Sequence, residues 1–238
     1  MWKRHYSFTL CFISIVFLNL FAEFEYVSNL RLYVKPLICI ALCIYLFRRT
    51  YLQTGFSRLI FLGLILSLFG DSFLLFAGGS VYFFLYGLIA FLLAHILYSL
   101  AFFRDFKNDP QASKFYGHLM LFTMGVFSLS YYSWIRDYLN DFRIPVMAYM
   151  FVISIMVILA GYRYRRVNLL SFQLIYLGAL FFVISDAALA YNKFVDPYPY
   201  SGILIMGTYM LAQYLITLGS IERTVSVSRR EAGQLITE

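Results

Sequence analysis

The sequence predicts an all-α membrane protein built as a bundle of eight transmembrane helices. Hydrophobic residues make up 62% of the chain and charged residues only 13%, whereas a soluble domain carries roughly 25% charged residues. The apolar residues also gather into runs that approach the length of about 20 residues that a helix needs to cross a bilayer. We predict eight spans, at residues 6–22, 31–47, 58–77, 81–103, 115–135, 143–162, 169–192 and 201–220.

The first predicted span follows a basic start and resembles a signal peptide, but no small-x-small cleavage site precedes Glu23. We therefore expect it to be retained as a helix. The later connections are short, and Gly78–Ser80 and Asp196–Pro199 have the composition of tight turns. We expect residues 1–222 to form one eight-span domain and residues 223–238 to form a polar cytoplasmic tail.

Charge asymmetry orients the bundle. Of the 19 lysines and arginines, 14 fall on the side of the N-terminus, while Arg31, Lys35, Arg136, Arg143 and Lys193 fall on the other. Basic residues accumulate in cytoplasmic connections, so we expect both termini in the cytoplasm. The net charge of +7 is scattered rather than clustered, which argues against nucleic acid as a partner. We expect a multi-pass protein of a bacterial plasma membrane.

Two aspartates, Asp71 and Asp186, lie inside long apolar runs. An ionisable residue at the centre of a membrane helix costs about 2.5–3.5 kcal/mol on insertion scales, so it normally faces a partner, a cavity or a substrate. The two residues are 115 positions apart in similar surroundings, and Tyr98 and Gln213 follow them at equal spacing. This pattern favours a 4+4 internal repeat that brings matching groups together around a shared cavity.

Counting residues from the span ends places both aspartates in the outer half of the bilayer, within reach of Lys35. We therefore expect one cavity to hold Lys35, Asp71 and Asp186, with His95 deeper and Tyr98 and Gln213 nearer the cytoplasm. Two carboxyl groups in a medium of low dielectric constant differ in proton affinity and so supply an acid and a base. The two histidines in spans, His95 and His118, lack metal-site spacing, and we expect neither a metal ion nor a cofactor.

At these residues the chain resembles the YhhN-like lysoplasmalogenase family of multi-span membrane proteins. The resemblance follows family order over residues 33–219 and covers most of the chain. Its pieces are Lys35-Pro36, LFGDSFLL with Asp71, YGLIAFLLAHILY with His95 and Tyr98, PVMAY with Tyr149, GALFFVISDAALA with Ser185 and Asp186, and TYMLAQYLI with Tyr209 and Gln213.

The resemblance implies hydrolysis of the vinyl ether bond of a lysoplasmalogen, which gives a fatty aldehyde and glycerophospho-ethanolamine or -choline. The expected partners are the lysophospholipid substrate and the lipid bilayer; the sequence does not address the oligomeric state. One of Asp71 and Asp186 is the expected catalytic acid and the other is the expected carboxylate, and the sequence does not say which is which. The residues expected to position water or the head group are Lys35, His95, Tyr98, Tyr149, Ser185, Tyr209 and Gln213.

Two other functions fit the same residues. A zinc-dependent intramembrane lipid amidase or esterase of the ceramidase kind would use His95 and the aspartates as ligands. A small lipid or solute transporter would instead rock its two halves about Asp71 and Asp186 without breaking a bond.

Overall fold

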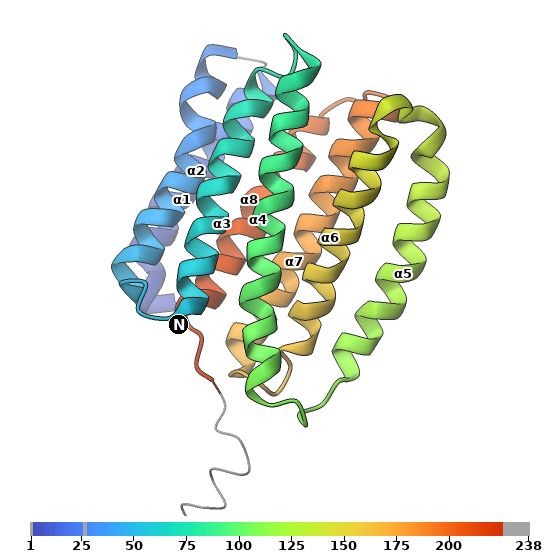
Figure 1. Cartoon of the computed structure of the whole chain (residues 1–238). Coiled ribbons are helices and arrows are strands. Elements are labelled where there is room, and N and C mark those ends of the chain that lie inside the picture. Colours follow the sequence, from blue (N-terminus) through green and yellow to red (C-terminus); the bar gives the residue numbers. More distant parts are fainter. Residues whose placement is uncertain (1, 26–27, 226–238) are drawn as a thin grey trace, which may run out of the picture.

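The computed structural model describes residues 2–25 and 28–225, which fold into eight long helices with no strand among them (Figure 1). Beyond Val225, the predicted polar tail, including Arg229 and Arg230, lies outside the described residues. The helices are α1 (Trp2–Phe24), α2 (Ser28–Thr50), α3 (Gly55–Leu75), α4 (Val81–Asn108), α5 (Phe115–Ile135), α6 (Arg143–Tyr162), α7 (Leu169–Ala190) and α8 (Ser201–Ile221).

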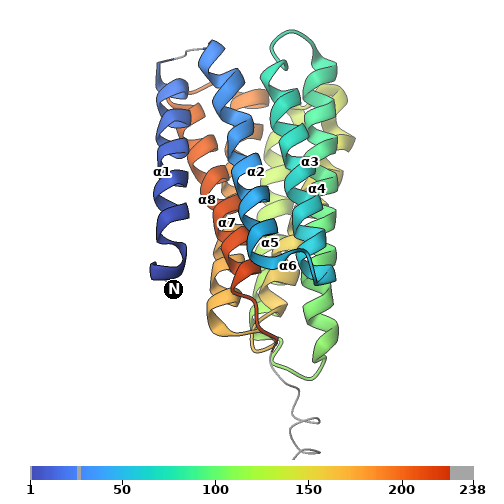
Figure 2. The ribbon, with the colours of Figure 1, turned by 90° about the vertical axis from the view of Figure 1, so that its left-hand side faces the viewer.

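Successive helices run in opposite directions, so the first helix begins and the last helix ends at the same end of the bundle (Figure 2). We call this the inner end and the opposite one the outer end; their assignment to the cytoplasm and the exterior stays a prediction. Short connections impose the alternation. Ser80 caps α4 in the turn after α3, and a π-helical turn, Tyr191–Val195, extends α7 at the outer end.

In the described part of the chain, seven helices are long and apolar enough to cross a membrane. The remaining helix, α5, is not among them, because tyrosine, serine, glycine and histidine interrupt its apolar residues. It nevertheless runs alongside α6 through the same layer (Figure 1). The protein is thus a multi-pass membrane protein with eight helices, in agreement with the number predicted.

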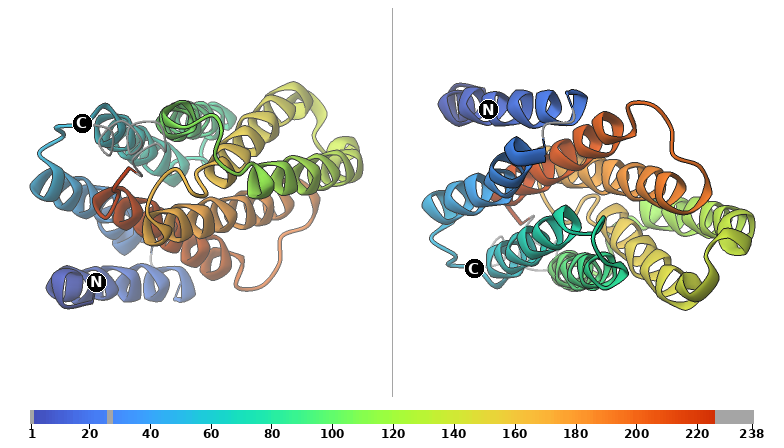
Figure 3. Two further views of the ribbon diagram at one scale, coloured as in Figure 1. Left: turned by 90° about the horizontal axis from the view of Figure 1, so that it is seen from below. Right: turned by 90° about the horizontal axis from the view of Figure 1, so that it is seen from above.

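The bundle is apolar both inside and outside, as expected for a protein solvated by lipid. The core side chains include Ile38, Leu64 and Phe182, all fully buried, while Phe122 and Leu129 of α5 are more than two-thirds exposed. Seen along the helix axes, α8 lies centrally and contacts α1, α2, α3 and α7 (Figure 3). Helix α5 lies at one edge and packs mainly on α6.

Small residues allow the closest helix pairs to meet. A Cβ atom on Gly178 of α7 would lie 3.0 Å from the carbonyl oxygen of Ala212 in α8. A Cβ on Gly63 of α3 would lie 2.2 Å from the ring of Tyr98 in α4. Close backbone approach at glycine is a general basis of helix association in membranes. It fixes here how far α4 and α8 stand from the helices that carry the aspartates.

A buried ion-pair network closes the inner end. Asp105 of α4 is fully buried and accepts a hydrogen bond from Nε of Arg163 at 2.8 Å and further bonds from Arg223. Arg163 also donates to Ser171, whose hydroxyl donates to the carbonyl oxygen of Gly219 at 2.6 Å. The network therefore ties α4, α7 and α8 to the segments that follow α6 and α8.

We expect Asp105→Asn to destabilise the protein by about 3–5 kcal/mol, because it leaves Arg163 buried without its counter-charge. Thermal unfolding of the detergent-purified protein measures the loss. The matched control is Asp137→Asn, which removes an exposed aspartate paired with Arg136 and is expected to change the midpoint little. Equal midpoints for the two variants would contradict a structural role for the network.

Candidate active site

Asp71 lies one turn before the end of α3 and is bound by residues of α2 and α8. The hydroxyl of Tyr209 donates to its Oδ2 at 2.6 Å, and the ammonium of Lys35 lies 4.0 Å from its Oδ1. The thiol of Cys39, one turn after Lys35, lies 3.6 Å from Oδ2 and 3.2 Å from the Tyr209 hydroxyl. The carboxylate thus has one cation and two neutral donors around it, and its side chain is only 2% exposed.

This cluster extends toward the inner end through Gln213 and Tyr98. The side-chain amide of Gln213 donates to the Tyr209 hydroxyl at 3.4 Å, and the Tyr98 hydroxyl donates to the Gln213 carbonyl at 2.9 Å. Both side chains are fully buried. Gln213 thus holds the Tyr209 hydroxyl and Tyr98 holds Gln213, and neither forms a hydrogen bond with the carboxylate of Asp71.

Asp186 lies one turn before the end of α7 and has different neighbours. The hydroxyl of Tyr149 on α6 donates to its Oδ2 at 2.7 Å. Nε2 of His95 on α4 lies 3.9 Å from the same oxygen, too far for a direct hydrogen bond. Within the described residues, no lysine or arginine pairs with Asp186, and neither ring nitrogen of His95 has a hydrogen-bond partner.

Aromatic rings separate the two clusters. The ring of Phe182 lies 4.8 Å from that of His95 on one side and 5.7 Å from that of Tyr209 on the other. Phe91 also lies 5.7 Å from Tyr209. These rings fill the space in which the sequence analysis expected a common cavity.

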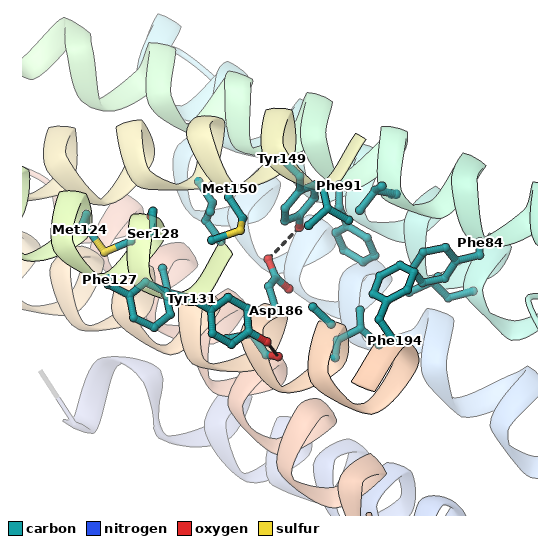
Figure 4. Close-up of a pocket in the computed structure, with 18 residues that line it drawn as sticks. Phe84, Phe91, Met124, Phe127, Ser128, Tyr131, Tyr149, Met150, Asp186 and Phe194 are labelled. Atoms are coloured by element: carbon teal, nitrogen blue, oxygen red, sulfur yellow. Dashed lines mark hydrogen bonds between the residues drawn. The ribbon is translucent and has the colours of Figure 1, made fainter. Parts of the chain in front are cut away.

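A narrow apolar cavity of about 60 Å³ lies beside Asp186 between α4, α5, α6 and α7 (Figure 4). Asp186 and Tyr149 stand midway along it, Met124 and Phe127 line one end, and Phe84 and Phe194 line the other. Neither Asp71 nor Lys35 lines this cavity, which corrects the expectation that one cavity holds all three. Asp186 is accordingly the more accessible aspartate, with a side chain 17% exposed.

The sequence-predicted site residues therefore divide into two groups. Lys35, Tyr98, Tyr209 and Gln213 gather around Asp71, while His95 and Tyr149 lie beside Asp186. Ser185 contacts neither carboxylate, because its hydroxyl donates to the carbonyl oxygen of Ile205 in α8. It holds α7 against α8 rather than facing the cavity.

Sequence reasoning missed Cys39 and Tyr131. Cys39 follows Lys35 by four residues, a spacing that puts both on one helix face, so its contact with Asp71 was accessible from the pattern. Tyr131 lines the cavity and donates to the carbonyl oxygen of Ala187 at 2.6 Å. Nothing in the sequence of α5 marks that residue.

The described residues contain no group of three or more histidine, cysteine, aspartate or glutamate side chains arranged to hold a metal ion. Besides the carboxyl groups, the side chains that could ligate a metal ion are one histidine and one tyrosine near Asp186, and one thiol and one tyrosine near Asp71. The arrangement thus offers two separate carboxyl groups, one balanced by Lys35 and one facing an apolar cavity.

Comparison with known proteins shows to which family the chain is similar. The model of the YhhN family matches residues 30–220. The chain is 35% identical to human lysoplasmalogenase TMEM86A over 68% of its own length and 65% of that protein, so the alignment spans just under two-thirds of the relative. The corresponding values are 32%, 79% and 75% for bovine TMEM86A, and 31%, 72% and 67% for human TMEM86B.

No solved structure matches the chain significantly. The family match covers most of the eight-helix bundle, from α2 to α8, and includes both aspartates and every residue that contacts them. The protein belongs to the YhhN family.

Proposed function

We propose that this protein is a lysoplasmalogenase that hydrolyses the vinyl ether bond of lysoplasmenyl-ethanolamine or -choline. The products are a fatty aldehyde and glycerophospho-ethanolamine or -choline. The names of the relatives support the activity. The observation that carries the mechanism is the carboxyl group of Asp186 within a largely apolar cavity that no other charged residue lines. We also expect the protein to lie in a bacterial plasma membrane, with its termini in the cytoplasm.

The reaction needs a proton at carbon. Protonation of the vinyl carbon farther from the ether oxygen consumes the double bond and leaves an oxocarbenium ion on the other carbon. Water adds to that carbon and releases a proton, which forms a hemiacetal. The hemiacetal then expels the glycerol oxygen as a hydroxyl group and becomes the aldehyde.

In this proposal Asp186 donates the proton. It lines the cavity that accepts the apolar chain, and no lysine or arginine of the described residues holds it as an anion. After the transfer, its carboxylate lies beside the cation and stabilises it, and it then accepts the proton released by water. Tyr149 fixes the carboxyl orientation through its hydrogen bond.

His95 is proposed to position the water molecule. Its buried ring nitrogens have no hydrogen-bond partner among the described residues, and Nε2 lies 3.9 Å from Asp186. A water molecule bonded to Nε2 of His95 and to the carboxyl group of Asp186 gives Nε2 a hydrogen-bond partner. The same water molecule is thus in contact with the carboxyl group that accepts its proton.

Asp71 is proposed as the second carboxylate, acting from outside the cavity. Lys35 and Tyr209 hold it in one position. Its negative charge offsets the cation of Lys35, which would otherwise destabilise the oxocarbenium ion through a medium of low dielectric constant.

We expect Asp186→Asn to lower aldehyde release from lysoplasmenyl-ethanolamine by about a hundredfold to ten-thousandfold, the usual contribution of a general acid. Asp71→Asn is expected to lower it on the order of tenfold, as a charge acting at a distance. The exposed Asp196→Asn is the matched control, and the acyl lysolipid is the control substrate.

Full activity in a well-folded Asp186→Asn protein would contradict the assignment of the acid. Loss of activity on treatment with a chelator would instead favour a zinc hydrolase. Uptake or binding of the lipid without product would favour a transporter.

We expect Tyr149→Phe to lower the turnover rate roughly tenfold, because the carboxyl group of Asp186 loses the one hydrogen bond that orients it. Tyr131→Phe is the matched control: this hydroxyl lies in the same cavity but donates to a backbone oxygen. The measurement is the rate of aldehyde release by each of the two variants at saturating substrate. A similar loss in both would show that cavity shape, rather than the bond to Asp186, sets the rate.

A further inference from the structure

Lys193 lies beside the outer end of the cavity. It belongs to the π-helical turn Tyr191–Val195 that extends α7, and its ammonium lies 5.1 Å from the centre of the Phe84 ring. Phe84 lines the cavity, and so does Phe194, the residue after Lys193 (Figure 4). Lys193 is exposed, and no carboxylate of the described residues forms an ion pair with it. A cation free to bind an anion therefore stands at the rim of the apolar site.

The rim of the cavity at this end is a packed cluster of aromatic rings. The rings of Phe84, Phe142 and Phe194 pack on one another with centres 5.4–5.6 Å apart. The π-helical turn brings Phe194 into this cluster while Lys193 stays outside it, and such turns are often found at functional sites. Three elements, α4, the segment before α6 and the extension of α7, thus form an apolar rim with the ammonium of Lys193 beside it.

The spacing from Asp186 fits the geometry of a glycerophospholipid. Lys193 follows Asp186 by seven residues, which corresponds to about 10 Å along the helix axis. In the substrate, the glycerol carbons and one ester oxygen separate the ether oxygen from phosphorus, an extended length of about 6 Å judged from ordinary bond lengths. An ammonium–phosphate hydrogen bond adds about 3 Å. The backbone rise and the substrate length are compatible when the vinyl ether lies at Asp186 and the head group points to the outer end, because the flexible lysine side chain can take up the difference.

The chain direction agrees with this placement. The other end of the cavity, with Met124 and Phe127 of α5, is lined by no charged residue and lies about midway along α5, away from the outer end (Figure 4). An alkenyl chain pointing there remains in apolar surroundings, whereas a phosphate pointing there would lose its hydration without a partner. Only the outer end offers the phosphate both water and a cation.

We propose that Lys193 binds the phosphate of the substrate head group and so sets the preference for phospholipids over neutral alkenyl lipids. This inference rests on the proposed function, because it places the vinyl ether at Asp186. Lys193 makes the same contact with ethanolamine and choline head groups, since both carry the phosphate diester. It touches no reacting atom, so its effect lies in binding rather than in turnover.

The test compares Lys193→Gln with wild type on two substrates of equal chain length, lysoplasmenyl-ethanolamine and the 1-alkenylglycerol that lacks the phosphate. We expect the KM for the phospholipid to rise roughly tenfold, as for the loss of one charge-assisted hydrogen bond, with kcat unchanged. The KM for the alkenylglycerol is expected to stay the same. Lys193→Arg is expected to retain most of the phospholipid preference.

Arg136→Gln is the matched control, because Arg136 is an exposed cation at the same end of the bundle and pairs with Asp137. Equal KM changes for both substrates in Lys193→Gln, or no change for either, would overturn the proposal. Binding of the saturated 1-alkyl analogues with and without phosphate gives a second readout that needs no hydrolysis. Loss of the phosphate preference there would support Lys193 even if no aldehyde is formed, so the two proposals fail separately.

Discussion

The organisation of this bundle depends on how it balances buried carboxyl groups in an apolar interior. Asp105 is neutralised by Arg163 and Arg223, and Asp71 by Lys35 with hydrogen bonds from its neighbours. Asp186 has only the hydroxyl of Tyr149 and a histidine beyond bonding distance. A carboxyl group without a cation in such a medium favours its neutral form over the anion. Of these three aspartates, Asp186 alone lacks a compensating cation, and it is also the one that lines the cavity, which is why we assign it the proton.

The two clusters follow one plan. Lys35 and Tyr149, Asp71 and Asp186, and His95 and Tyr209 are offset by 114, 115 and 114 positions. Asp71 of the first half contacts Tyr209 of the second, and Asp186 of the second lies beside His95 of the first. This is the arrangement expected of a 4+4 repeat. A lysine in one cluster stands where a tyrosine stands in the other, so one carboxylate has a cation beside it and the other has a hydroxyl group.

Sequence reasoning reached the helices and the two aspartates because hydropathy and the cost of a buried charge act locally along the chain. The predicted spans agree with the helices to within a few residues, except where α4 continues to Asn108 and α1 begins at Trp2. The approach of Lys35 to Asp71 also followed from depth along the helices. The division into two clusters did not, because it depends on Phe91 and Phe182, whose packing depends on how α4, α7 and α8 rotate about their axes. Tyr149 was named through the family resemblance as a residue that positions water or the head group, but its hydrogen bond to Asp186 was not predicted.

We propose that hydrolysis begins with proton transfer to carbon in an apolar cavity. Mass spectrometry can follow this step in products formed in deuterated water and, separately, in water enriched in the heavy oxygen isotope. Protonation at carbon followed by water addition predicts solvent deuterium on the aldehyde carbon next to the carbonyl group, and a glycerophospho-ethanolamine that carries no heavy oxygen. Heavy oxygen in the glycerol hydroxyl would contradict it, because water would then have attacked the glycerol carbon instead of the oxocarbenium ion.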